Sequence, residues 1–171
     1  MNTDTILHGF FNNFGFIMML LGIVVALART AAGKPFFAEL LRWSLVFGVG
    51  VNALYSGLGH VFMPDYSAKL IGWEDSPFQL EVGMADIAFG VAGLMCVKGN
   101  YGFQLATAIM AMIFFGGDAI GHIHQMQVAD NFATGNAGSW FWIDCSLPFI
   151  LLISAVVVGL KGSKPVSSSP A

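Results

Sequence analysis

Five long apolar segments constrain the fold of this chain more than any other feature of its sequence. They cover residues 10–28, 40–62, 78–97, 101–126 and 140–160. A helix needs about 20 mostly apolar residues to cross the hydrocarbon core of a bilayer. Only 10% of the residues are charged and 56% are hydrophobic, whereas a soluble domain carries roughly 25% charged residues. The sequence therefore predicts an all-α polytopic membrane bundle with five transmembrane helices.

The segments between and after the spans indicate a single domain. Turn-forming runs such as AAGKP at 31–35 and TGNAGS at 134–139 separate the apolar segments. We expect residues 1–162 to form one transmembrane helical domain and the Ser-rich residues 163–171 a flexible cytoplasmic tail. No Lys or Arg precedes the first apolar segment, whereas Arg29 and Lys34 follow it. This charge order is the reverse of a signal peptide, so we predict a retained first helix.

Lys and Arg are distributed unequally between the two sides of the predicted bundle. With the N-terminus outside, the inner side holds Arg29, Lys34, Arg42, Lys98, Lys161 and Lys164. The outer side holds only Lys69. Because cytoplasmic loops carry an excess of Lys and Arg, we predict a multi-pass protein of the cell inner membrane with its N-terminus outside and its C-terminus inside. With only seven Lys and Arg residues, the chain has no basic face for nucleic acid.

Ionisable residues inside the spans gather near the side predicted to be outside. At about 1.5 Å per residue, most of them fall within about 15 Å of that surface. They are His60, Glu81, Asp86, Asp118, His122, His124 and Asp144. A charge at the bilayer centre costs about 2.5–3.5 kcal/mol on insertion scales. Several acids in one layer must therefore be protonated, paired or bound to a metal, and this layer is the predicted site.

Helical spacing indicates which residues of this polar layer share a helix face. Asp118 and His122 are four residues apart and share a helix face, whereas His124 is rotated by about 200° from His122. We therefore favour His122 over His124 as a site residue. On the second span, Asn52 and His60 belong to a stripe of small and polar residues at four-residue spacing. Small residues let helices approach closely in lipid, so this stripe is predicted to face the bundle interior.

The residue types in the layer suit a metal ion or a redox cofactor. Imidazole and carboxylate together bind zinc, iron, copper or manganese, and the candidate metal ligands are Asp118, His122 and Asp144. The candidate cofactor-binding residues, for a quinone headgroup or haem b, are His60, Glu81 and Asp86. The sequence contains no HExxH or CxxCH motif, so c-type haem is excluded. The alternative is that these residues are buried hydrogen-bonded groups that fix helix packing, or solvated groups where they lie close to the surface.

Three strings within residues 48–126 form a pattern: GLGHVFMPDYSAKLIGW, SPFQLEVGMADIAFGVAGLM and LATAIMAMIFFGGDAIGHIHQM. By this pattern the chain resembles the DoxX-like small multi-pass bacterial membrane proteins, and most closely an uncharacterised branch of them. Only Glu81 corresponds to the typical early-helix acid of that group. The group usually has four spans, so the fifth span with Asp144 is a departure. The resemblance implies a link to membrane redox complexes, quinone chemistry or thiol homeostasis, often as an accessory subunit.

Three functions are open on the sequence, and whether the protein is an enzyme is open with them. The first is a redox-associated protein that binds a metal ion or a quinone headgroup in the outer polar layer. The second is a non-catalytic accessory subunit of a membrane complex, or a homo-oligomer, in which the layer only specifies packing. The third is a proton-coupled transporter. It is disfavoured because the inner half of the bundle lacks a second polar layer and the sequence shows no inverted repeat.

Overall fold

The computed structural model describes residues 3–162, and every regular element within them is a helix. The elements are α1 (Thr3–Asn12), α2 (Phe14–Ala31), α3 (Phe36–Trp43), η1 (Ser44–Val51), α4 (Asn52–Phe62), α5 (Pro64–Ile71), α6 (Phe78–Met95), α7 (Tyr101–Ala129), α8 (Thr134–Ala137) and α9 (Ser139–Gly162). Five helical stretches are long and apolar enough to cross a membrane, and α3, η1 and α4 together form one of them. This confirms the predicted all-α bundle of five membrane-spanning helices. The predicted tail, residues 163–171, lies outside the described residues.

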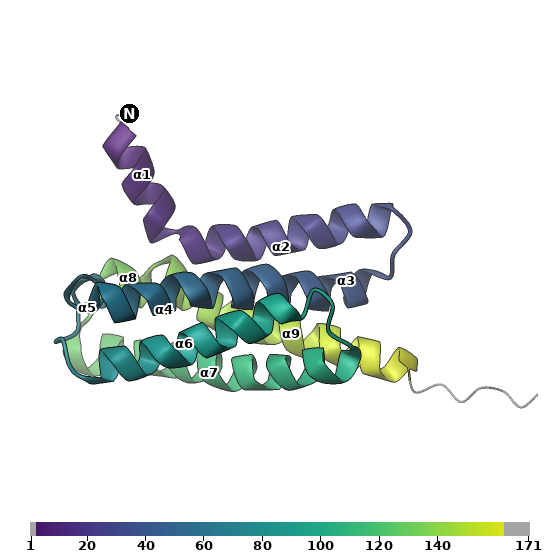
Figure 1. Cartoon of the computed structure of the whole chain (residues 1–171). Helices are drawn as coiled ribbons and strands as arrows, with labels where there is room; N and C mark the ends of the chain where they lie inside the picture. The colour runs from purple at the N-terminus through teal and green to yellow at the C-terminus, as the bar shows by residue number, and fades with distance from the viewer. Residues whose placement is uncertain (1–2, 163–171) are drawn as a thin grey trace, which may run out of the picture.

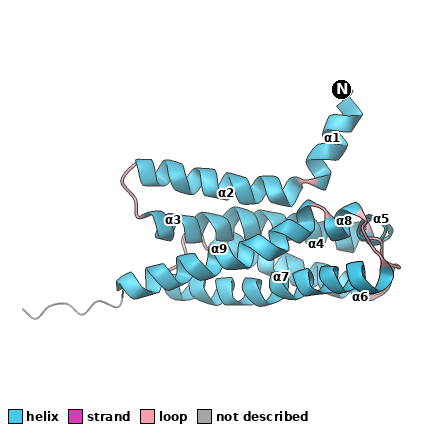
Figure 2. Cartoon of the chain, turned by 180° about the vertical axis from the view of Figure 1, so that it is seen from behind, coloured by secondary structure: helices cyan, strands magenta, loops and turns pink. Residues whose placement is uncertain are grey.

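The five long helices lie side by side, and α1 is tilted away from them at one end (Figure 1). Successive long helices run in opposite directions, so the bundle has two distinct ends. One end carries α5 and α8 (Figure 2), and we call it the pocket end. The other carries the loop between α2 and α3 (Figure 1), and we call it the basic end. The most extensive helix pairs are α4 with α6 and α7 with α9.

Two of the long helices begin four residues away from the predicted starts. The first span was predicted from residue 10, but the chain bends at Asn13, whose φ of −111° and ψ of 14° are not helical, and α2 begins at Phe14. The second span was predicted from residue 40, but α3 begins at Phe36, directly after Pro35. Proline has a fixed φ and no N–H, so it is tolerated at a helix start but not in the interior.

Glycines allow α6 to lie directly against the second span. A Cβ on Gly93 would lie 2.5 Å from the backbone nitrogen of Gly50, and a Cβ on Gly57 would lie 2.6 Å from the carbonyl oxygen of Gly83. Helix backbones come this close in a membrane only where side chains are absent. The contacts of α6 with η1 and α4 therefore hold one wall of the bundle at a fixed spacing.

The middle of the second span is wound more widely than an α-helix. Residues Ser44–Val51 form the π-helix η1, between α3 and α4. Its buried Leu45 and Val49 belong to an apolar core that also contains Leu147 and Leu151 of α9. A π-helical stretch of this length is rare. Because these residues lie near the middle of their helices, the apolar core separates the pocket end from the basic end.

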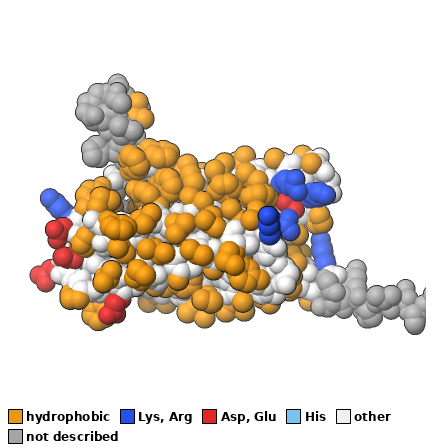
Figure 3. All heavy atoms as spheres, in the orientation of Figure 1, with side chains coloured by type: hydrophobic (Ala, Val, Ile, Leu, Met, Phe, Trp, Pro, Cys, Tyr) orange, Lys and Arg blue, Asp and Glu red, His pale blue; other side chains and the backbone are white. Residues whose placement is uncertain are grey.

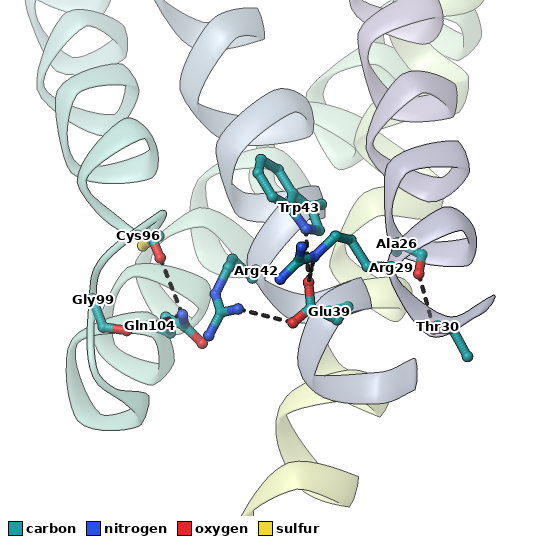
Figure 4. Close-up of polar contacts among 9 residues, drawn as sticks. All are labelled: Ala26, Arg29, Thr30, Glu39, Arg42, Trp43, Cys96, Gly99 and Gln104. Carbon is teal, nitrogen blue, oxygen red and sulfur yellow. Dashed lines mark hydrogen bonds and ion pairs between the residues drawn. The ribbon is translucent and has the colours of Figure 1, made fainter. Parts of the chain in front are cut away.

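A buried carboxylate organises the basic end. Glu39 is 3% exposed and accepts hydrogen bonds from Arg29 Nε at 3.2 Å, Arg42 Nη1 at 2.9 Å and Trp43 Nε1 at 2.9 Å (Figure 4). Arg29 lies in the last turn of α2, so this cluster ties α2 to α3 across their loop. Lys and Arg side chains gather at this end, whereas the flank of the bundle is mostly hydrophobic (Figure 3). That this end faces the cytoplasm stays a prediction from the positive-inside rule.

Candidate functional site

A pocket of about 250 Å³ lies inside the bundle at the pocket end. Helices α4, α6, α7 and α9 contribute its walls, and α5 and α8 contribute to its lining at the end of the bundle. Its ionisable side chains are His60, Asp86, Asp118, His122 and Asp144. Its aromatic side chains are Tyr55, Tyr66, Trp73, Phe114, Phe115 and Trp140. No Lys or Arg occurs among the described lining residues. The structure therefore brings five of the six predicted site residues into one aromatic, acidic pocket.

Hydrogen bonds determine which nitrogen of His122 carries a hydrogen. The side-chain nitrogen of Asn136 donates to the carbonyl oxygens of Asn131 at 2.8 Å and of His122 at 3.3 Å. The side-chain oxygen of Asn136 is thereby directed at His122 Nδ1, 2.7 Å away. An amide oxygen only accepts hydrogen bonds, so Nδ1 must carry a hydrogen.

The other ring nitrogen of His122 forms a proton-sharing pair with Asp144. Nε2 of His122 lies 3.3 Å from Oδ2 of Asp144, and the two residues are 8% and 7% exposed. Because Nδ1 is already protonated, a hydrogen bond between the pair needs one further proton, either on Nε2 or on the carboxyl group. An uncompensated charge at this depth would be costly, so the two groups depend on each other. The pair can therefore store a proton beside the pocket.

A second imidazole comes from α4 and is held by α6. The ring nitrogen Nδ1 of His60 is in hydrogen-bond contact with the side-chain oxygen of Gln79, which is buried. Because the partner atom is an amide oxygen, Nδ1 donates and Nε2 is left as an acceptor. Asp86, also on α6, is 4% exposed, whereas Asp118 on α7 is exposed although it lines the pocket. Of these two carboxyl groups, only that of Asp118 reaches the surface of the protein.

Two further polar atoms of the pocket lining have no hydrogen-bond partner among the described residues. They are the side-chain oxygen of Asn52 and Nε1 of Trp140. Asn52 is only 2% exposed. A buried polar group without a partner costs about 1–3 kcal/mol. The pocket lining therefore carries one acceptor and one donor whose hydrogen-bonding capacity is unused within the described part of the chain.

Two of the layer's residues lie away from the pocket. Glu81, a predicted cofactor-binding residue, is exposed and does not line it. The reason is rotation: Gln79 faces His60, and Glu81, two residues later, is turned by about 200° from it. The prediction for Glu81 therefore receives no support. His124 is also exposed and outside the pocket lining, in the position that helical spacing predicts for it.

The three predicted metal ligands share the pocket but do not form a metal centre in this structure. Across residues 3–162, no group of three His, Cys, Asp or Glu side chains could hold a metal ion. Both ring nitrogens of His122 are also engaged, by Asn136 and Asp144. The assignment of Asp118, His122 and Asp144 to a metal thus stays a prediction without structural support.

The sequence reasoning missed two residues that shape this site. Asn136 belongs to the TGNAGS run, which was interpreted only as a helix breaker, yet it is fully buried. Trp140, at the start of the fifth predicted span, also lines the pocket. A buried asparagine in a short polar loop gives no periodic signal, so its pairing with His122 could be found only from the fold.

Comparison with known proteins gives one match. The family described as "Family of unknown function (DUF6790)" matches residues 12–161, which contain all five membrane-spanning stretches. No curated protein and no solved structure matches the chain. The match leaves the resemblance to DoxX-like proteins as a prediction, and it assigns no ligand to the pocket.

Proposed function

Because the chain belongs to the DUF6790 family, whose function is unknown, we propose a function from the pocket itself: it binds the ring headgroup of a lipid-soluble quinone. The binding site lies within a multi-pass membrane bundle, which we place in the cell inner membrane with the pocket end outside. The observation that carries this proposal is the proton-sharing pair of His122 and Asp144 on the wall of an aromatic pocket.

The chemistry of the pocket matches that of a quinone ring. A quinone has a flat ring, which aromatic side chains bind by stacking or edge contacts, and carbonyl oxygens, which accept hydrogen bonds. The unpartnered Nε1 of Trp140 is a donor for one such oxygen. Quinones take up protons when they are reduced, and the His122–Asp144 pair holds a proton next to the pocket. A volume of about 250 Å³ suits a single ring better than a drug-sized molecule, which needs roughly 300–1,000 Å³.

The interior of the bundle favours binding over transport. The apolar core around Leu45, Val49 and Leu147 lies between the pocket and the basic end. Polar groups that mark a substrate or proton path through a membrane protein usually continue across the membrane. Their concentration at the pocket end supports a binding site that does not continue as a path to the basic end.

Fluorescence titration tests the proposal. The protein in lipid nanodiscs is titrated with a methoxy-substituted benzoquinone that carries no tail, and quenching of the tryptophan residues in the pocket lining reports binding. Replacing His122 with glutamine is expected to weaken binding about tenfold, because it removes the proton-sharing pair with Asp144 and the imidazole ring that Asn136 and Asp144 hold on the pocket wall. Asp144→Asn, which keeps the side-chain shape, is expected to have a similar effect.

The matched control is His124→Gln, since His124 is exposed, lies one half-turn away and does not line the pocket. Its affinity should equal that of the wild type, and treatment with a metal chelator should change nothing. Absence of saturable quenching in the wild type, or equal weakening by His124→Gln and His122→Gln, would contradict the proposal.

A lipophilic amine is a second candidate ligand. It is favoured by Asp118, which lines the pocket and has no ion-pair partner among the described residues. Aromatic side chains such as Trp73 also attract cations to their faces. Titration with benzylamine separates the two ligands: saturable binding that Asp118→Asn abolishes, without any binding of the quinone, would replace the quinone by an amine.

A further inference from the structure

We infer that the pocket opens sideways to the bilayer between α6 and α7, and that its ligand therefore carries a hydrocarbon tail that leaves through this opening. The inference rests on the proposed function, because it concerns the route by which a quinone reaches the same pocket. It adds to that function the chemical class of the whole ligand, a ring with a hydrocarbon tail, and the residues that line the opening through which it enters.

Helices α6 and α7 pack only loosely against each other. Although α6 and α7 follow each other in the chain, α6 packs mainly on α4 and α7 mainly on α9, and they make few contacts with each other. On α7, Gly117 and Gly121 line the pocket, and a Cβ on either would meet nothing within 4 Å. Most other glycines of the bundle would clash with a neighbouring atom. Open space thus lies next to the pocket along this part of α7.

Exposure shows that the pocket is continuous with the outer surface here. Gly117 and Asp118 line the pocket and are nevertheless exposed, as is Val82 on the facing helix α6, at 39%. A residue that both lines a cavity and is exposed marks a place where the cavity reaches the surface. The opening therefore lies between Val82 on α6 and the Gly117–Asp118 pair on α7.

Aromatic contacts bound the opening along the bundle. Towards the basic end, the rings of Phe89 on α6 and Phe114 on α7 are in contact, with centroids 4.8 Å apart. Towards the pocket end, Trp73 lies beside His122, with ring centroids 6.3 Å apart. Asp118 is one helical turn beyond Phe114 and one turn before His122. The opening is therefore a window of about two helical turns, with Asp118 near its middle.

This window faces hydrocarbon. The 29 residues of α7 extend about 43 Å at about 1.5 Å each, whereas the hydrocarbon core is about 30 Å thick. Asp118 lies about three turns before the end of α7 at Ala129, and is therefore within the hydrocarbon layer. The neighbouring side chains Met84, Ile113 and Ile120 are 55%, 72% and 70% exposed, as expected of a lipid-facing surface.

The alternative route, through the pocket end, is narrowed by tight packing between α5 and α8, although the lining residues Met63, Tyr66 and Trp73 are 55%, 50% and 44% exposed there. A Cβ on Gly135 of α8 would lie 2.7 Å from the carbonyl oxygen of Leu70 on α5. Asn131, in the segment that leads into α8, also donates to the carbonyl oxygen of Ile71 at 2.9 Å. This hydrogen bond joins that segment to the end of α5. A carboxylate such as Asp118 in the hydrocarbon layer is costly, and a headgroup bound in the pocket lies beside this carboxylate and covers it. Of the two routes, the window between α6 and α7 is the one that opens on hydrocarbon, where a lipid-soluble ligand is dissolved.

Glycine substitutions in nanodiscs test the window. Two probes are titrated by tryptophan quenching: the benzoquinone without a tail, and the same ring with a long alkyl tail. Gly121→Leu and Gly117→Leu place a side chain in the window. They are expected to weaken binding of the tailed quinone about tenfold, because the added side chain and the tail compete for the same space, and such steric crowding typically costs about 1–3 kcal/mol. The affinity for the tailless quinone should fall by a smaller factor than that for the tailed quinone, because both glycines line the pocket but only the tail passes between α6 and α7.

Gly116→Leu is the matched control. Gly116 precedes Gly117 on the same helix, and a Cβ there also meets nothing within 4 Å, but it does not line the pocket. It should leave the affinity for both quinones unchanged, and circular dichroism should show that all three variants fold. The lateral window would be overturned, while the proposed function stands, by either of two results. One is that Gly121→Leu and Gly117→Leu bind the tailed quinone as tightly as the wild type; the other is that they lose affinity for both quinones by the same factor. Failure of the wild type to bind either quinone would instead overturn the proposed function, and the inference with it.

Discussion

Replacing Gly93 with alanine is expected to lower the free energy of unfolding by about 3 kcal/mol or more, because overpacking against backbone has no rotamer that relieves it. The added Cβ would lie 2.5 Å from the backbone nitrogen of Gly50, 2.6 Å from its Cα and 2.7 Å from the carbonyl oxygen of Leu45. All three atoms belong to the backbone of the second span. The substitution must therefore push α6 away from η1, and with it the wall that carries Asp86.

Thermal unfolding in detergent micelles, followed by circular dichroism, measures this effect. Gly116→Ala is the matched control, because the new Cβ would meet nothing within 4 Å. Alanine is the better helix former by about 0.5–1 kcal/mol, so this control should be as stable as the wild type or more so. Equal stability of Gly93→Ala and Gly116→Ala would contradict a backbone contact this close between α6 and η1.

Replacing Glu39 with alanine is expected to lower the free energy of unfolding by about 2–3 kcal/mol, the scale of hydrogen bonds to a charged group. Glu39 accepts hydrogen bonds from Arg29, Arg42 and Trp43, and all three donors lose their partner at once. The cost is limited because the side chains of Arg29 and Arg42 are 45% and 32% exposed, so water can solvate the guanidinium groups. Without Glu39, no carboxylate joins Arg29 at the end of α2 to the side chains of α3.

Glu81→Ala serves as the control for Glu39→Ala, since Glu81 is an exposed acid on another helix. A surface substitution of this kind changes stability by about 0.5 kcal/mol or less. The same micelle unfolding experiment compares the two variants. If both were equally stable, the carboxylate of Glu39 would contribute no more than a surface charge.

The five membrane-spanning helices could be predicted from the sequence because the bilayer imposes a simple rule. Backbone groups in hydrocarbon must be satisfied within the segment, so an apolar run of sufficient length has to be a helix. The same physics located much of the site. Polar side chains in the spans turn inward, and His60, Asp86 and Asp144 were expected in one layer for this reason. The structure places them around one pocket.

The partners of these side chains could not be predicted, because they depend on helix rotation and on short polar segments. Gln79 and Glu81 are two residues apart, and only the rotation of α6 decides that Gln79 faces His60 while Glu81 is exposed. Asn136 fixes the hydrogen on His122, but it lies in a polar run without periodicity. Glu39 was overlooked at the basic end because the orientation argument counts only Lys and Arg.

The π-helix η1 sets the angular phase of the helix that follows it. Each residue of η1 advances by less than the 100° of an α-helix, and this lag accumulates over its eight residues. The face of α4 that presents Asn52 and His60 to the pocket is therefore chosen in the middle of the bundle, by residues that do not line the pocket. A change that tightened these turns would rotate one wall of the site out of place without altering any group in it.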